Sequence, residues 1–125
     1  MPTPEIGRAE AGRVDKPWGH ELRWGVTERY AGKVLHITRG EALSLQYHDR
    51  KDEFLYVVRG AIDMELGGPD GVLTKHRMEE GDTLHITPGT RHRMTAVEDT
   101  DIFEVSTPEL DDVVRLEDRY GRAGT

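Results

Sequence analysis

The chain has 125 residues, which is enough for one domain with a single core. Charged residues make up 33% of it, hydrophobic residues 35%, and the formal net charge is −7, so the core must be lean and the surface well solvated. Because the basic residues form no long run, the composition argues against a nucleic-acid-binding protein. No apolar run approaches the roughly 18 residues of a membrane span, and the first residues lack a signal-peptide core, which argues against membrane association.

The sequence contains no cysteine. A disulfide framework and a thiolate metal site are therefore excluded, and a cytoplasmic location is expected. The negative net charge also bears on small ligands, since an anionic ligand would have to be captured by a local cationic patch and not by the field of the whole molecule.

The first 14 residues are polar and contain two prolines and two glycines. Such a segment buries too little apolar surface to hold itself in place, so we expect 1–14 to be a flexible N-terminal arm. The remainder, 15–125, is expected to form one domain.

From residue 20 onward, short runs of β-type residues alternate with turn residues. The runs are 33–38, 54–58, 61–66, 72–78, 83–87, 91–97 and 102–107, and the strongest turn signal is Gly-Gly-Pro-Asp-Gly at 67–71. Many short strands at near-regular spacing, without a sustained 3.6-residue period before 108, predict an all-β sandwich or barrel. Residues 108–116 fit either a short helical turn or a last edge strand.

Four polar residues in two stretches form the most informative feature of the chain. Gln46 and His48 are two residues apart, so in a strand their side chains project from the same face. Glu53, after a short polar turn, and His92, in a later hairpin, could complete one cluster of nitrogen and oxygen ligands. This donor set suits one divalent metal ion such as Zn²⁺, Mn²⁺, Co²⁺, Fe²⁺ or Ni²⁺. The alternative is that Gln46 and His48 simply form the polar face of a half-exposed strand.

Glycines flank these residues and complete two motifs. The first motif is Gly40, Gln46, His48, Glu53 and Gly60, and the second is Gly81-Asp82, Pro88-Gly89 and His92. The spacing resembles that of the cupin superfamily, which implies a double-stranded β-helix, a small all-β jelly-roll barrel. Glutamine in the leading position is similar to the mannose-6-phosphate isomerases, in which Gln, His, Glu and His bind the metal.

The resemblance extends beyond the two motifs, from about 16 to 122. Lys-Pro-Trp-Gly-His-Glu at 16–21, Leu-Ser-Leu-Gln at 43–46 and the segment 111–122 resemble the isomerase domain of bacterial type II mannose-6-phosphate isomerase/mannose-1-phosphate guanylyltransferases. This implies a metal-dependent isomerase that interconverts an aldose and a ketose phosphate. The reaction needs a metal to polarise the oxygens on C1 and C2 and a base to move a proton between the carbons C1 and C2. It also needs a cationic site for the phosphate.

The resemblance and the side-chain chemistry together suggest roles for five further residues. Arg115 is the candidate for the arginine that approaches the reacting carbons. Glu104 is a candidate base, with a cavity histidine or a metal-bound hydroxide as alternatives. Lys51 and Arg91 are candidates for phosphate contacts, because ammonium and guanidinium groups match phosphate oxygens. Trp18 either stacks on a sugar face or serves as a core aromatic.

Two departures from the resembled isomerases keep other functions open. Lys51 stands where those enzymes tend to have arginine, and Phe54-Leu55 replaces their His-Trp. The alternatives are a cupin that binds a sugar or sugar nucleotide without turnover and, less favoured, a cupin oxygenase, since the same ligands accept Fe²⁺. The expected ligand is a small sugar phosphate. A homodimer is also expected, because exposed β edges favour pairing and small cupins often cover their outer face by dimerising.

Overall fold

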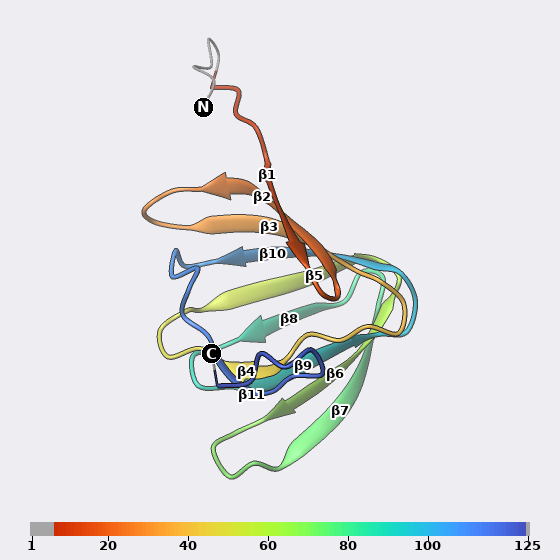
Figure 1. Ribbon diagram of the computed structural model, residues 1–125. Coiled ribbons are helices and arrows are strands. Elements are labelled where there is room, and N and C mark those ends of the chain that lie inside the picture. Colours follow the sequence, from red (N-terminus) through yellow and green to blue (C-terminus); the bar gives the residue numbers. More distant parts are fainter. Residues whose placement is uncertain (1–6, 125) are drawn as a thin grey trace.

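Two antiparallel β-sheets face each other in the computed structural model, which describes residues 7–124 (Figure 1). The first sheet contains, in spatial order, β1 (Gly12–Lys16), β2 (Gly19–Val26), β3 (Ala31–Ile37), β10 (Thr100–Ser106), β5 (Glu53–Arg59) and β8 (Thr83–Ile86). The second contains β11 (Val114–Glu117), β4 (Leu45–Tyr47), β9 (Arg91–Ala96), β6 (Ala61–Gly67) and β7 (Leu73–Glu79). The predicted all-β jelly-roll fold is confirmed. Within 7–124 there is no helix long and apolar enough to cross a membrane.

The core lies between the sheets because alternate strand residues point inward. On β5, Leu55 and Val57 are buried while Phe54 and Tyr56 are exposed, as the two-residue period of a strand requires. Fully buried apolar side chains of both sheets meet in this layer: Ile37, Leu55, Val57, Ile62, Met64, Ile86 and Ile102. At one end of the barrel the inward positions become polar, and that end holds the candidate site.

The N-terminal hairpin begins inside the range expected for the flexible arm. Strand β1 starts at Gly12 and pairs with β2, so the last three residues of 1–14 belong to the first sheet. Residues 1–6 of that range lie outside the described residues. The turn that follows ends at Gly19, where a Cβ atom would overlap the carbonyl oxygen of His36, so only glycine lets β2 start this close to β3.

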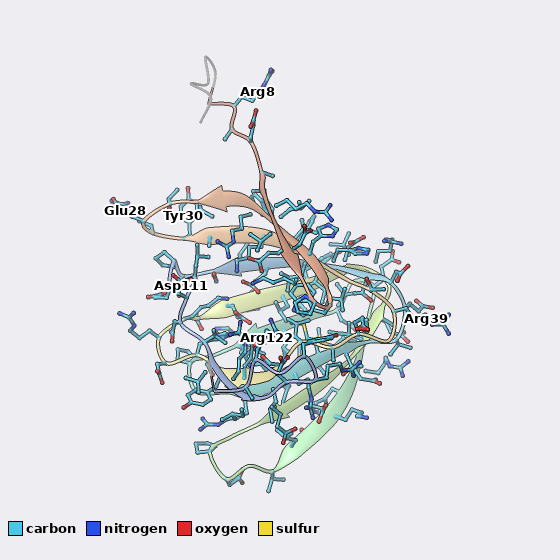
Figure 2. The ribbon with its side chains drawn as sticks, in the orientation of Figure 1. Arg8, Glu28, Tyr30, Arg39, Asp111 and Arg122 are labelled. Atoms are coloured by element: carbon cyan, nitrogen blue, oxygen red, sulfur yellow. The ribbon has the colours of Figure 1, made fainter. Side chains whose placement is uncertain are left out.

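The C-terminal segment runs past the polar end of the barrel. Of the two structures considered for 108–116, the edge strand is found from Val114 onward, where β11 pairs with β4, and turns precede it. Figure 2 shows Arg122 of this segment over the middle of the molecule, whereas Arg8 lies on the extended N-terminal stretch away from the barrel. The segment therefore supplies side chains to the site.

Candidate metal centre and its cavity

Three of the four predicted ligands converge in the structure. His48 directly follows β4, Glu53 opens β5, and His92 lies on β9, whose register places it opposite Gln46 of β4. One ligand atom from each of His48, Glu53 and His92 lies within 4.8 Å of the others, and all three residues are buried. We refer to them as the His-Glu-His group.

Each histidine is oriented by a backbone carbonyl. The Nδ1 atom of His48 lies 2.6 Å from the oxygen of Asp112, and Nδ1 of His92 lies 2.9 Å from the oxygen of Thr90. A ring that donates from Nδ1 to a carbonyl presents an unprotonated Nε2, which is the arrangement found around protein-bound metals. Both Nε2 atoms are buried without a hydrogen-bond partner in the described residues.

The geometry of the group fits a divalent ion. The Nε2 atom of His48 lies 3.6 Å from Glu53 Oε2, and the Nε2 atom of His92 lies 3.7 Å from Glu53 Oε1. Ligands about 2.1 Å from an ion are spaced roughly 3.0–3.4 Å apart, so a contraction of a few tenths of an ångström would suffice. Burial lowers the pKa of both His48 and His92 and so favours the neutral, metal-binding form. The group could therefore hold a metal.

Gln46 lies in the wall of the adjoining cavity together with His48, as their spacing in the sequence predicted. The hydroxyl of buried Ser44 donates a hydrogen bond to the Gln46 Oε1 atom at 2.6 Å. This contact fixes the amide and leaves the second lone pair of Oε1 available. Its role as a fourth ligand stays a prediction.

A chain of alternating charges extends from Glu53 across the inner face of the first sheet. The Lys51 ammonium lies 3.0 Å from Glu53 Oε2 and 3.1 Å from Glu104 Oε2. Beyond it, the Lys33 ammonium lies 3.8 Å from Glu104 and 3.5 Å from Glu21. Although burial acts to lower it, Glu104 and Glu53 raise the pKa of Lys51 above its ordinary value, so Lys51 stays charged.

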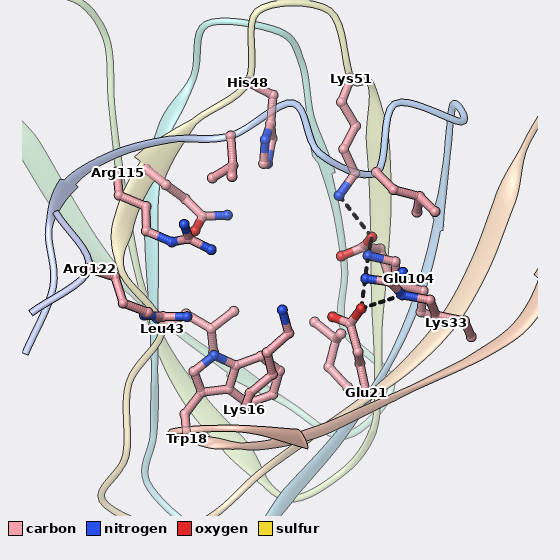
Figure 3. Close-up of a pocket in the computed structure, with 15 residues that line it drawn as sticks. Lys16, Trp18, Glu21, Lys33, Leu43, His48, Lys51, Glu104, Arg115 and Arg122 are labelled. Carbon is pink, nitrogen blue, oxygen red and sulfur yellow. Dashed lines mark hydrogen bonds and ion pairs between the residues drawn. The ribbon is translucent and has the colours of Figure 1, made fainter. Parts of the chain in front are cut away.

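A cavity of about 80 Å³ adjoins the His-Glu-His group, with His48 in its wall (Figure 3). The cationic residues around it are Lys16, Arg23, Lys33, Lys51, Arg115 and Arg122, and the carboxylates are Glu21 and Glu104. Leu35, Leu43, Leu110, Val113 and Trp18 supply the apolar part of the wall. A small polyhydroxylated molecule with a negative charge suits such a wall.

The five residues assigned to substrate or catalysis are not all in this cavity. Trp18, Lys51, Glu104 and Arg115 line it, with Trp18 almost fully buried. Arg91 is absent from the cavity wall: its guanidinium lies 3.9 Å from the centre of the Tyr47 ring and donates to the Gly89 carbonyl. The geometry thus groups four of the five with the candidate metal ligands.

Sequence reasoning missed Lys16, Glu21, Lys33 and Arg122 as cavity residues. Lys33 shares its parity with the buried Leu35, and this was a usable signal, because a charged residue on the inner face of a strand needs a partner. The partner itself depends on the register that sets Lys33 opposite Glu104, which the sequence does not state.

Known proteins resemble this chain in sequence and in fold. A family model described as a cupin domain matches residues 33–106. Mannose-1-phosphate guanylyltransferase ManC of Salmonella typhimurium is 35% identical over 114 residues, covering 87% of this chain and 23% of that protein. Xanthan biosynthesis protein XanB of Xanthomonas campestris is 32% identical over 124 residues, covering 93% of this chain and 26% of XanB. The chain thus spans about a quarter of the length of these relatives.

Among solved structures, that of KdgF from Halomonas sp. matches with a TM-score of 0.69 and 26% identity, over 80% of this chain and 90% of KdgF. The capsular polysaccharide assembling protein CapF of Staphylococcus aureus matches with a TM-score of 0.73, over 90% of this chain and 33% of CapF. At 17% identity the second match bears on the fold alone.

Proposed function

The chain belongs to the cupin family, and from this premise we propose that it is a metal-dependent isomerase of a sugar phosphate. The reaction is the interconversion of an aldose and a ketose, such as mannose 6-phosphate and fructose 6-phosphate. One observation carries the proposal: a buried His-Glu-His group adjoins a cavity whose wall combines cations with the carboxylate of Glu104. A Lewis acid, a base and an anion site are what an aldose–ketose isomerisation requires.

The relatives support a substrate from sugar metabolism. ManC is by name a mannose-1-phosphate guanylyltransferase and XanB a xanthan biosynthesis protein, and this chain aligns with about a quarter of each. The activity of those whole proteins therefore comes to this chain only as a proposal.

In the proposed site, Gln46, His48, Glu53 and His92 hold the divalent ion, which when bound polarises the C1 and C2 oxygens of the sugar. Two backbone carbonyls keep His48 and His92 in the tautomer that the site needs. Lys51 contacts Glu53 Oε2 at 3.0 Å, and this oxygen also faces His48, so the ammonium group fixes the orientation of the carboxylate toward the site.

The proton transfer is assigned to Glu104. Its carboxylate lies in the cavity wall, held between the ammonium groups of Lys51 and Lys33. It would take the proton from one of the two reacting carbons and return it to the other through an enediol. Arg115, in the wall opposite Glu104 in Figure 3, would stabilise the negative charge that develops on the oxygens.

The test is an assay of mannose 6-phosphate and fructose 6-phosphate in D₂O with metal-loaded protein. We expect net interconversion with deuterium at C1 or C2, loss of both signals with a chelator, and recovery on addition of Mn²⁺, Zn²⁺ or Co²⁺. Arg115→Ala should keep its metal and lose about 100-fold in turnover. The exposed Arg39 provides the matched control, and Arg39→Ala should turn over like the wild type.

A negative result is informative if the metal is saturating. The proposal fails if neither interconversion nor exchange is found across a panel of hexose and pentose phosphates. The protein would then be a sugar-binding cupin without turnover.

A further inference from the structure

The charged residues of the cavity are segregated. Figure 3 shows Arg115 and Arg122 on one side and Glu21 and Glu104 on the other, with the ammonium group of Lys16 pointing into the space between them. Lys16 ends strand β1, Arg115 lies on β11, and Arg122 follows in the C-terminal segment. Residues from both ends of the chain thus place three cations around one part of the cavity.

The remaining cations of the wall are held by the acidic side. Lys51 and Lys33 pair with the cavity carboxylates as described above, and the Arg23 Nε atom lies 2.7 Å from Glu21 Oε1. Lys16 differs from them, since it forms no ion pair with any residue between 7 and 124. Glu21, the acid with the strongest influence on it, is already contacted by Arg23 and Lys33.

The Lys16 ammonium group lies mainly among like charges. Burial lowers the pKa of Lys16 and outweighs the opposing effect of Glu21, while Arg23, Lys33 and Arg115 add to the lowering. Burial also lowers the pKa of Arg115 and Arg122 adds to that effect, while Asp118, which contacts Arg122 at 2.9 Å, opposes it. Like charges brought together in a partly desolvated space repel each other, and an anion bound among them would relieve that repulsion.

We propose that Lys16 and Arg122, next to Arg115, form a subsite for the anionic group of a polyhydroxylated ligand, and that Lys16 determines the preference for charged over neutral sugars. The inference rests on the proposed function, and it moves anion binding away from Lys51 and Arg91. Lys51 is engaged by Glu53 and Glu104, and Arg91 stacks on Tyr47.

The size of the cavity narrows the chemistry of the anion. The cavity measures about 80 Å³ and is partly open to solvent. A single phosphate or carboxylate is compact enough to lie among the cationic side chains of its wall. The ligand class is therefore a sugar monophosphate or a sugar acid.

Binding measurements on Zn²⁺-loaded protein test the subsite without relying on turnover. By calorimetry, mannose 6-phosphate or galacturonate should bind at least 10-fold more tightly than mannose, and the tighter of the two identifies the anion. Lys16→Gln should weaken the binding of the charged sugar 10- to 100-fold and leave that of mannose unchanged, while Lys16→Arg should retain most of it. Lys75→Gln, at an exposed position on β7, is the matched control and should bind like the wild type.

The salt dependence gives a second readout. The affinity of the wild type for the charged sugar should fall as ionic strength rises, and it should fall less steeply in Lys16→Gln. Equal affinity of the wild type for mannose and both charged sugars would overturn the subsite, as would unchanged binding in Lys16→Gln. Charge-selective binding without turnover would uphold the subsite and refute the isomerase. Turnover with an unchanged KM in Lys16→Gln would uphold the isomerase and refute the subsite.

Discussion

The histidines of this chain differ in what holds their ring nitrogens. His48 and His92 meet backbone carbonyls at Nδ1 and are buried, so their Nε2 atoms face the interior. His36 and His85 instead contact the carboxylates of Asp101 and Asp52 at 2.7 Å, where water reaches them. A carbonyl at Nδ1 together with burial favours the neutral ring that a metal ligand requires, and among the histidines of residues 7–124 only His48 and His92 combine the two.

This contrast yields a prediction for metal content. The purified protein should contain about one divalent metal per chain after dialysis, and His48→Ala/His92→Ala should contain almost none, because two of the ligands are lost. His85→Ala removes an exposed strand histidine instead and should keep its metal. Elemental analysis by mass spectrometry measures the metal, and equal content in the double variant and the wild type would refute the site.

Sequence spacing was sufficient for the candidate ligands and insufficient for their surroundings. Gln46 and His48 share a face because they are two residues apart, and that holds in any strand. The environment of Lys51 depends on Glu104, which is 53 positions away and arrives through the pairing of β10 with β5. A contact of this kind follows from register, and register is a property of the folded sheets.

The inner face of the first sheet has an apolar zone and a polar zone on the same strands. β3 contributes Leu35 to the first and Lys33 to the second, and β10 contributes Ile102 and Glu104 in the same way. Buried charges are costly unless paired, and here neighbouring strands present opposite signs at adjacent positions. The inward-facing residues, every second one along each strand, thus form the core over one part of the strand and the cavity wall over the other.

Strand β10 is also tied to its neighbours by a charged side chain near its start. One carboxylate oxygen of Asp101 lies 2.7 Å from His36 Nδ1 on β3, and the other accepts a hydrogen bond from Arg59 Nε on β5 at 2.9 Å. Although partial burial opposes the shift, His36 and Arg59 lower the pKa of the Asp101 carboxyl group. Asp101 therefore links three strands only while it is ionised.

The expected pH dependence follows from that direction. A carboxyl group with a lowered pKa in the folded state stabilises the fold above its unfolded pKa of about 3.9, and this stabilisation is lost as the pH falls through the folded pKa. Asp101→Asn should reduce the free energy of unfolding by about 1 kcal/mol at neutral pH, and by less at a strongly acidic pH at which the carboxyl group is protonated. Urea unfolding at both pH values measures this, and an equal loss at both would contradict the electrostatic origin.

At the scale of the whole molecule, most of the strands that were predicted have a buried face, and β7, which is exposed along most of its length, is the exception. Each of the seven predicted runs overlaps a strand, from 33–38 within β3 and its following residue to 102–107 around β10. The β1–β2 hairpin was not predicted, because the sequence of β1, Gly-Arg-Val-Asp-Lys, does not alternate apolar and polar residues. The position of β1 is set by its hydrogen bonds to β2, which the sequence pattern does not reveal. The pattern therefore did not identify Lys16 as a cavity residue.

The outer face of the first sheet is more apolar than a solvated surface requires. Large side chains that are 44–51% exposed stand on β2, β5 and β10: Trp24, Val26, Phe54, Tyr56, Phe103 and Val105. Because β10 pairs with β5 in a register that sets Phe103 opposite Tyr56, part of this set is contiguous across strands. Contiguous exposed apolar patches of this kind mark surfaces that bind another molecule.

We expect a second copy of the chain to cover this face, which would make the protein a homodimer. Sedimentation equilibrium at micromolar concentration should give about twice the chain mass of 14.2 kDa. Trp24→Glu/Phe103→Glu should yield a folded monomer, because two carboxylates would be desolvated in the interface. Val72, 65% exposed at the β6–β7 hairpin, is the control, and Val72→Glu should remain dimeric. A wild-type mass near that of one chain would refute the dimer and leave the patch for a different partner.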